Sequence, residues 1–313
     1  MTKYSVVIPV FNRDHLVSKA IDSVLQQTFK DYEVIVCDDG STDDTERVLD
    51  QYGARIRRVR SNRLGPGGAR NAAIAEARGR YVACLDSDDV WMPWTLECVD
   101  QAIAAVAPDC LVYMQPHPLA QMCDTNAAAR SPLSIRQYAD LLSAPLTSPH
   151  GSGMIGAIPR QLIVDIGGFD SSLVVAEDHD LALRLGVGVP YVVIESPWTL
   201  LCSTRDDGIS RNRPAIYVAS YSRIIEKEAN HLYPGGVSRR RARRMRIGMM
   251  VSIHALKSVE SCEYKQALAL YRRSIRLMLS IYRWRFVAFF PLLTFLHLIL
   301  NPTNLFPMGR RLA

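Results

Sequence analysis

The sequence predicts an α/β fold, with one mostly parallel sheet flanked by helices and a helical C-terminal extension. Short β-branched apolar runs alternate with segments of helical spacing over residues 4–85, and beyond Arg211 the spacing is helical. Alternation of this kind produces a parallel sheet that helices cover on both faces. With 313 residues, 48% hydrophobic and 22% charged, the chain is long enough for one large α/β domain and an appendage.

Two strand–helix units are expected at the start of the chain. Residues 4–11 are a β-branched apolar run, which predicts a strand, and residues 16–24 have apolar side chains at helical spacing. Residues 33–37 predict the second strand. Ser41 is the expected N-cap of the next helix, with Asp44 three residues later as its capping-box partner.

Two further strands are expected before residue 90. Residues 56–60 predict the third strand, and the Gly-Pro-Gly-Gly segment at 65–68 predicts a loop. Residues 69–78 are rich in alanine and predict a helix that Gly79 ends. Residues 81–85 predict the fourth strand.

Acidic clusters follow two of these strands. Asp38 and Asp39 end one strand, and Asp86, Asp88 and Asp89 come directly after another. Ligands of parallel sheets bind outside the carboxyl ends of the strands, so both clusters are expected at one crevice. Carboxylates are hard ligands that suit Mg²⁺ or Mn²⁺ shared with a diphosphate. The alternative for each cluster is a solvated turn or an acid that favours a helix N-terminus.

A glycine-rich segment and a second acidic pair add two candidate features. Glycines in 65–71 allow close approach of backbone to a ligand, and Arg70 offers a planar fork to phosphate or carboxylate. Glu177 and Asp178 lie where a helix is expected to open, and an acid there can take the proton of an attacking hydroxyl. The alternatives are a surface arginine and helix-dipole complementarity. The glycine spacing differs from the dinucleotide-binding pattern GxGxxG, which argues against a nicotinamide dehydrogenase.

Five segments occur in the order and spacing of a known family. They are VVIPVFNR, QTFKDYEVIVCDDGSTDDT, GPGGARNAAI, ACLDSDDVWMP and AEDHDLALRL. Together they resemble the inverting family 2 glycosyltransferases of GT-A fold over residues 3–190. The resemblance implies a mixed sheet, a nucleotide-sugar donor and a DXD motif that binds Mg²⁺ or Mn²⁺.

The resemblance also implies a role for each candidate side chain. One in-line displacement would invert the anomeric centre of the sugar, and the metal would neutralise the departing diphosphate. The implied nucleotide-binding residues are Pro9, Val10, Asp39, Arg70 and Asp86, with Asp88 as the metal ligand, Asp178 as the catalytic base, and Asp38, Asp89 and Glu177 in support.

The expected reaction is the addition of a single sugar. The chain has no QxxRW string after the Asp178 helix and no set of membrane-spanning helices, unlike processive synthases. The resemblance and Asp39 favour a UDP-sugar donor, with a saccharide or glycolipid acceptor in bacterial surface polysaccharide or lipopolysaccharide synthesis. Residues 150–156 are expected to help select the sugar. A polyprenyl-phosphate sugar transferase and a non-catalytic membrane-associated binding protein with the same fold are the alternatives.

Charge and composition divide the chain into two regions. Residues 1–210 are the expected glycosyltransferase domain, with a nucleotide-sugar-binding half at 1–100 and an acceptor-binding half at 101–210. Residues 211–313 are expected to be helical. They carry most of the excess of basic over acidic residues that gives the net charge of +6, including a dense run of arginines at 239–246. That run is either a solvated helix face or a contact for anionic lipid headgroups. Nucleic acid is not an expected partner, since no aromatic-basic motif is present.

Residues 284–300 predict an interfacial membrane segment. They are mostly apolar and shorter than the ~20 residues that span a bilayer. Trp284 and neighbouring arginines flank the segment, as interface anchors do. The alternative is a helix packed on the domain or on a second subunit. Seven cysteines without a CxxC pair and the absence of a signal peptide predict a cytoplasmic protein, peripheral on the inner face of the membrane.

Overall fold

The computed structural model describes residues 2–118, 131–146, 155–202 and 214–300. The chain forms two compact units, Met1–Asp206 and Asp207–Ala313, here called the first and second units. Of the residues expected to select the sugar, 150–154 lie outside the described residues. The assignment of residues 1–100 to the donor and 101–210 to the acceptor concerns function and stays a prediction.

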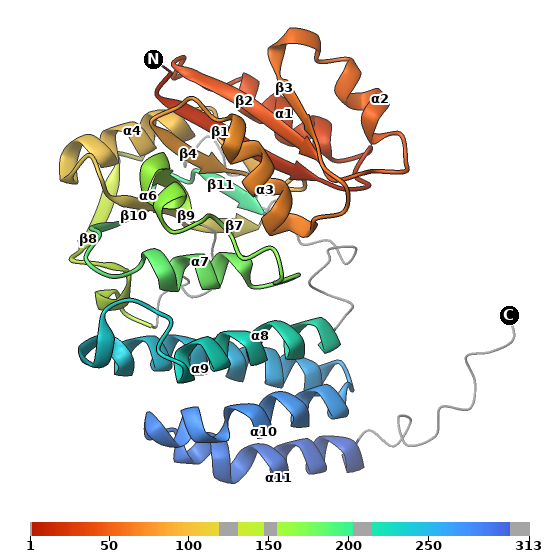
Figure 1. The fold of residues 1–313 in the computed structure, drawn as a ribbon, viewed down its shortest axis with the longest axis vertical. Coiled ribbons are helices and arrows are strands. Elements are labelled where there is room, and N and C mark those ends of the chain that lie inside the picture. The colour runs from red at the N-terminus through yellow and green to blue at the C-terminus, as the bar shows by residue number, and fades with distance from the viewer. Residues whose placement is uncertain (1, 119–130, 147–154, 203–213, 301–313) are drawn as a thin grey trace, which may run out of the picture. The chain divides into compact units, whose positions relative to one another are not determined.

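The first unit contains one large mixed sheet, as predicted (Figure 1). Within the described residues it has eight strands in the order β3-β2-β1-β4-β9-β6-β10-β8, of which β9 and β8 run antiparallel to their neighbours. The strands are β1 (Tyr4–Val10), β2 (Tyr32–Asp38), β3 (Arg57–Arg60), β4 (Tyr81–Cys84), β6 (Leu111–Met114), β8 (Ser134–Tyr138), β9 (Ile155–Pro159) and β10 (Tyr191–Ser196).

Helices cover both faces of this sheet because successive strand residues point to opposite sides. Alternate β1 residues such as Val6 and Ile8 share one buried cluster with side chains of α1, α2 and α4. Helix α3 packs against β1 and β2 and buries Ala69 and Ala73 outside that cluster. The helices of this unit are α1 (Val17–Leu25), α2 (Thr45–Asp50), α3 (Gly65–Glu76), α4 (Thr95–Val106), α6 (Arg160–Asp165) and α7 (Glu177–Leu185), with 3₁₀ turns at Gly53–Arg55 and Leu141–Ser143.

A small second sheet lies beside the acidic segment that follows β4. It consists of β5 (Val90–Trp91), β11 (Leu200–Cys202) and β7 (Pro116–Pro118), with β11 in the middle. Leu201 pairs with Val90 across the antiparallel β5–β11 ladder. This pairing brings the end of β11 next to the acids at 86–89, which precede β5.

The predicted loop at residues 65–68 is wrong, because α3 begins at Gly65. The carboxylate of Asp39 accepts hydrogen bonds from the backbone N–H groups of Leu64 and Gly65, at 2.7 and 2.8 Å. It therefore caps the helix from 25 residues upstream, and Pro66 fits the first turn because it needs no N–H partner there. The helix ends at Glu76, before the predicted residue 78.

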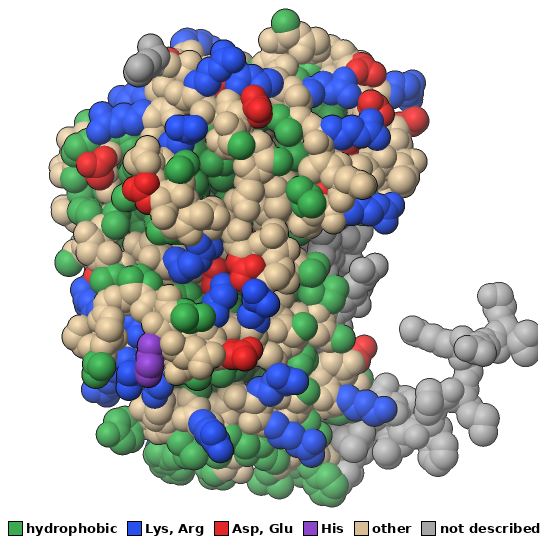
Figure 2. Space-filling view, in the orientation of Figure 1, with side chains coloured by type: hydrophobic (Ala, Val, Ile, Leu, Met, Phe, Trp, Pro, Cys, Tyr) green, Lys and Arg blue, Asp and Glu red, His purple; other side chains and the backbone are tan. Residues whose placement is uncertain are grey.

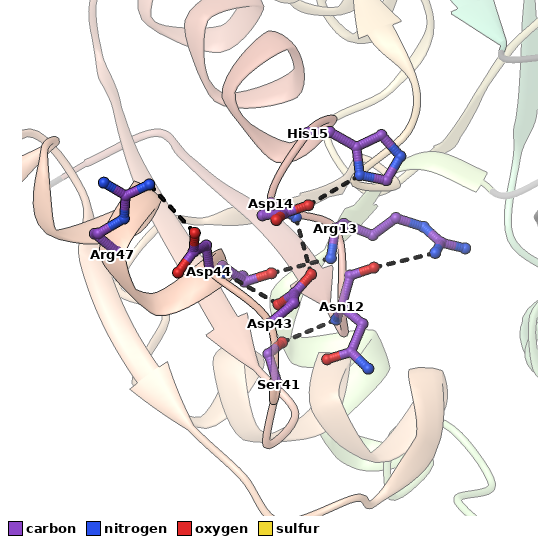
Figure 3. Close-up of polar contacts among 9 residues, drawn as sticks. Asn12, Arg13, Asp14, His15, Ser41, Asp43, Asp44 and Arg47 are labelled. Atoms are coloured by element: carbon purple, nitrogen blue, oxygen red, sulfur yellow. Dashed lines mark hydrogen bonds and ion pairs between the residues drawn. The ribbon is translucent and has the colours of Figure 1, made fainter.

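The predicted cap of α2 is also wrong, since this helix begins at Thr45 and not directly after Ser41. The hydroxyl of Ser41 instead accepts a hydrogen bond from the backbone N–H of Asn12, at 2.9 Å. The carboxylate of Asp43 accepts from the N–H groups of Thr45 and Asp14. The loops that follow β1 and β2 thus hold each other at the ends of their strands (Figure 3).

The second unit is a set of packed helices: α8 (Pro214–Ala229), α9 (Gly236–Glu260), α10 (Tyr264–Ser280) and α11 (Trp284–Leu300). Arg243, in the predicted basic run, is only 1% exposed and its Nε donates to Glu228 Oε2 at 2.8 Å. Arg246 is also buried. The run is therefore not one continuous solvated or lipid-facing surface, because the helix turns two of its arginines inward. No helix in the described part of the chain is long and apolar enough to cross a bilayer.

Candidate active site

The candidate residues gather at the carboxyl ends of three adjacent strands. Pro9 and Val10 end β1, and Val10 lies opposite Asp38 at the end of β2. The N–H of Asp39 donates to the carbonyl of Val10 at 2.8 Å. On the other side of β1, β4 ends at Cys84, and Asp86 follows after Leu85. The two acidic clusters therefore flank β1, as the strand pattern predicts.

Asp39 is buried and accepts three hydrogen bonds from neutral donors. Two come from the backbone at the start of α3, and the third comes from the hydroxyl of Ser61 at 2.6 Å. These bonds fix the carboxylate against the helix that carries Arg70. A carboxylate offers about four acceptor positions, so the group can still accept an N–H from a nucleobase. The base-binding role of Asp39 stays a prediction.

Asp38 is held separately, at the neighbouring strand end. Its carboxylate is buried and accepts the backbone N–H of Ser41 at 2.9 Å. It borders a pocket of about 290 Å³ together with Arg58, Val59 and Arg60 from β3. Asp38 thus shapes the turn after β2, and the structure gives it no contact with the acids that follow β4.

The three acids after β4 form a compact cluster, here called the acid triad: Asp86, Asp88 and Asp89. Each offers a carboxylate oxygen within 4.8 Å of those of the other two. An all-oxygen set of three carboxylates matches the ligand preference of Mg²⁺ and Mn²⁺. The residues present therefore fit the predicted divalent cation, with Asp88 in the middle of the motif.

A cysteine that the sequence pattern did not single out contacts this triad. The thiol of Cys202, at the end of β11, donates to Asp89 Oδ2 at 3.1 Å. Burial raises the pKa of this thiol, and the three acids raise it further. Cys202 therefore stays protonated and acts as a hydrogen-bond donor. It lies 113 residues from Asp89 in the sequence, so no local motif joins the two.

Arg70 connects the triad to helix α7. Its side chain is 5% exposed, and its two terminal nitrogens contact Asp86 Oδ1 and Glu177 Oε1, each at 2.6 Å. The guanidinium also lies 5.3 Å from the centre of the Phe169 ring. The interpretation of Arg70 as a surface arginine is therefore wrong. Its predicted contact with the donor diphosphate stays a prediction, and its partners within the protein are two carboxylates.

Helix α7 presents Glu177 and Asp178 at its first turn, as predicted. Burial raises the pKa of Glu177 to about 7, with Arg70 opposing the shift and Asp178 adding to it. The carboxylate of Asp178 accepts the backbone N–H of His179 at 2.8 Å. Burial also raises the pKa of Tyr113, with further contributions from Cys202 and Asp178. The Tyr113 hydroxyl thus lies near both Asp178 and the thiol that contacts the triad.

A second residue of α3 holds the loop that leads to α7. The side chain of Asn71 donates to the carbonyl of Phe169 at 2.9 Å and accepts the N–H of Phe169 at 2.8 Å. Gly168 has φ +73°, and a Cβ there would lie 2.4 Å from Asn71 Oδ1. No sequence motif pointed to a role for Asn71. A pair of glycines in the sequence indicates that another group lies too close for a Cβ, but it does not identify that group.

One chain of contacts reaches the residue next to Asp178. It passes from Asp86 through Arg70 to Glu177. Asp39 joins the same framework through the N-terminus of α3, the helix that carries Arg70. One buried arginine of the first unit thus joins the acid triad to the first turn of α7.

Comparison with known proteins gives a family match over the first unit. Residues 5–155 match the model of glycosyl transferase family 2. A UDP-Glc:alpha-D-GlcNAc-diphosphoundecaprenol beta-1,3-glucosyltransferase of Escherichia coli is 43% identical over 95 residues, 30% of this chain and 38% of that protein. An uncharacterized glycosyltransferase of Rickettsia prowazekii is 32% identical over 179 residues, 56% of each chain. The chain thus spans well under two thirds of the length of these relatives.

Solved structures share the fold at low sequence identity. S. aureus TarS in complex with UDP has a TM-score of 0.65 and 18% identity, over 96% of this chain and 88% of that one. A mannosyltransferase of Pyrobaculum calidifontis in complex with GDP-Man and Mn²⁺ has a TM-score of 0.55 and 17% identity, over 98% and 88%. The mixed sheet, the acid triad at its strand ends and the family match agree. The chain is similar to glycosyl transferase family 2 over residues 5–155, and its first unit has the GT-A fold.

Proposed function

We propose that the protein transfers one sugar from a nucleotide diphosphate donor, a UDP-sugar, to a lipid-linked saccharide, with inversion at the anomeric carbon and dependence on Mg²⁺ or Mn²⁺. The observation that carries this proposal is the bridge of Arg70 between Asp86 and Glu177. It links the cation-binding triad to the helix start that presents Asp178. The names of the relatives, which are glycosyltransferases, support the same reaction class.

The donor would be held at two places, its diphosphate by a bound cation and its nucleobase by Asp39. Asp88, with Asp86 and Asp89 beside it, would hold a divalent cation, which when bound neutralises the diphosphate leaving group. Asp39 would accept the imide N–H of uracil, and the ends of β1 would supply main-chain contacts through Pro9 and Val10. Arg70 keeps the Asp86 carboxylate oriented in this arrangement.

On the acceptor side, Asp178 takes the proton of the attacking hydroxyl. The acceptor oxygen forms a bond to the sugar C1, the bond from C1 to the diphosphate oxygen breaks, and the nucleoside diphosphate leaves with that electron pair. One displacement of this kind inverts the anomeric centre. Glu177 is paired with Arg70, which holds the first turn of α7 and keeps Asp178 in position.

The identity of the acceptor rests on the relatives. The E. coli relative acts on a diphosphoundecaprenol-linked GlcNAc, a saccharide already attached to a lipid. This favours a lipid-linked saccharide over a bare polyprenyl phosphate, which is the second candidate. The two are distinguished by the product: transfer to polyprenyl phosphate gives a single sugar on the lipid phosphate, whereas transfer to a lipid-linked saccharide lengthens the glycan by one unit.

The test is sugar transfer and donor hydrolysis by the purified chain with a panel of nucleotide sugars, in Mn²⁺, Mg²⁺ or a chelator. We expect turnover of a UDP-sugar that the chelator abolishes. Asp178→Asn should lower kcat by about 10²–10⁴-fold with little change in donor affinity, because only the base is lost. Asp88→Asn should weaken Mn²⁺ and donor binding together.

The matched control is Asp44→Asn, which removes an exposed carboxylate paired only with Arg47 among the contacts observed. This variant should keep the wild-type rate. Full activity in Asp178→Asn would remove Asp178 from the proposed base role. Binding of UDP-sugars without any turnover by the wild-type chain would instead favour the non-catalytic membrane-associated binding protein.

A further inference from the structure

Helices α10 and α11 of the second unit form a hairpin, and a hydrogen bond between them lies at a proline of α11. Pro291 lies inside α11 and has no N–H, so the carbonyl of Val287, four residues earlier, loses its helical donor. The hydroxyl of Tyr271 on α10 donates to this carbonyl at 2.7 Å. The rings of Phe286 and Phe290 pack on Tyr271, with centroids at 6.0 and 5.5 Å. The hairpin is therefore built around the proline rather than weakened by it.

Further contacts hold the same face of α11 along its length. The Tyr264 hydroxyl and His297 Nδ1 are 3.1 Å apart and join the start of α10 to the far end of α11. Phe290 and Thr294 are 3% and 5% exposed. The side of α11 that packs on its own unit is thus fixed, and the opposite side is presented to the surroundings in one orientation.

That opposite side is almost entirely apolar. Six large hydrophobic side chains on it are between 47% and 57% exposed, and the space-filling view shows hydrophobic side chains gathered over α11 (Figure 2). A helix that is hydrophobic all round is normally covered, and an exposed apolar patch of this kind marks an interaction site. The six residues, here called the apolar face, are Trp284, Phe289, Leu292, Leu293, Phe295 and Leu296.

The α10–α11 hairpin carries charged side chains of a single sign. Residues 264–300 contain six lysines and arginines, all exposed, and no aspartate or glutamate. The whole chain carries 31 acids among 313 residues, so their absence from this hairpin is a local feature. The six basic residues are Lys265, Arg272, Arg273, Arg276, Arg283 and Arg285.

We propose that the α10–α11 hairpin docks on an anionic phospholipid surface. The apolar face lies in the headgroup boundary, and the basic residues bind lipid phosphates. At 1.5 Å per residue the 17-residue α11 is about 26 Å long, less than the ~30 Å hydrocarbon core, so the helix lies along the surface and does not cross it. Two copies of the chain would bring like charges together, which disfavours a second copy as the occupant.

The proposal goes beyond the proposed function, since it needs neither donor nor turnover. The experiment mixes the full chain with vesicles of phosphatidylglycerol and phosphatidylcholine, or of phosphatidylcholine alone, and measures the bound fraction by sedimentation. We expect binding to the anionic vesicles that added salt weakens. Tryptophan emission should shift to the blue on binding, and this shift should be lost in Trp284→Phe.

The triple variant replaces three exposed residues of the apolar face together, Phe289→Ser, Leu292→Ser and Leu296→Ser.

The variants Arg272→Gln and Arg276→Gln test the basic residues, and each should weaken vesicle binding about fivefold. The matched controls are Val237→Ser, at a residue 74% exposed in α9, and Arg80→Gln in the first unit. Controls should bind like the wild type, and circular dichroism checks that all variants remain folded.

Two results would overturn the proposal. The first is wild-type vesicle binding by the folded triple variant. The second is a dimer in analytical ultracentrifugation that the triple variant dissociates, together with no vesicle binding by the wild type, because a second copy would then be the occupant of the apolar face.

Discussion

Two buried carboxylates near the carboxyl edge of the sheet are stabilised in opposite ways. Asp39 accepts hydrogen bonds from Ser61 and from two backbone N–H groups at the start of α3. Glu177 relies on one cation, Arg70, which it shares with Asp86. Both carboxylates are anchored to α3, one by its N-terminal dipole and one by a side chain on its second turn.

The two carboxylates therefore differ in how they respond to pH and to substitution. Backbone N–H groups cannot be titrated or rotated away, so the Asp39 network defines where α3 starts whatever the pH. The Arg70 network joins two elements that are 107 residues apart, and its balance depends on every charge in it. Removal of one member of a buried ionic group is far more costly than replacement of the whole group. The variants below use this contrast.

The largest effect is expected from Arg70→Met. The substitution keeps an extended side chain but leaves Glu177 buried without its cation, so unfolding free energy should fall by about 3–5 kcal/mol in urea denaturation. The double variant Arg70→Met with Glu177→Leu should recover a large part of that loss, since no buried charge is left unpaired. A double variant that is less stable than the single one would contradict the ionic account.

Asp39→Asn should be the next most severe change. The asparagine amide keeps one acceptor oxygen, but its NH₂ group replaces the other and faces a backbone N–H that the carboxylate accepted. The unfolding free energy should therefore fall by about 2–3 kcal/mol. Equilibrium denaturation of the variant measures this loss. Asp44→Asn, at a helix start with no side-chain cap, is the matched control and should change stability by less than about 0.5 kcal/mol. Equal losses in both variants would show that capping by Asp39 contributes nothing specific.

The pH dependence of Glu177 gives a third test. Because burial raises its pKa from 4.5 to about 7, the folded protein holds this proton more tightly than the unfolded chain. Its contribution to stability therefore falls as pH rises through that window. Glu177→Gln does not titrate, so the stability of the wild type relative to this variant should drop by about 3 kcal/mol between the two pH values. A difference that is flat with pH, measured by urea denaturation, would contradict the raised pKa.

The sequence was sufficient for the first four strands and for the acids that follow two of them. The apolar runs and the clusters at 38–39 and 86–89 are local patterns, and a parallel sheet places such ends together. The order of β9 and β8 within the sheet was not readable from those patterns, because antiparallel insertion depends on long-range pairing. The GT-A resemblance supplied the mixed sheet, and the structure shows which strands run antiparallel.

The partners of the site residues needed the structure. The cap of α3 comes from Asp39, 26 residues before Gly65, and the thiol next to Asp89 belongs to Cys202. In the second unit, Arg243 looked like part of a charged surface until Glu228 was placed beside it. In each case a local pattern specifies the residue type, whereas the contact depends on the folding of distant segments into one volume. Sequence alone therefore identified the candidate residues and left the bonds among them undetermined.

The smallest effect is expected from Ser61→Ala, which separates side-chain from backbone donors around Asp39. The hydroxyl is one of three donors, and the carboxylate keeps both bonds to the start of α3. Because the Asp39 carboxylate keeps its two backbone hydrogen bonds, loss of the third should lower the unfolding free energy by about 1 kcal/mol. Urea denaturation at several pH values gives the answer, and the loss should be the same across the window in which Glu177 titrates. A loss as large as that of Asp39→Asn would mean that the hydroxyl, rather than the backbone of α3, holds this carboxylate, and the contrast between the two networks would then no longer stand.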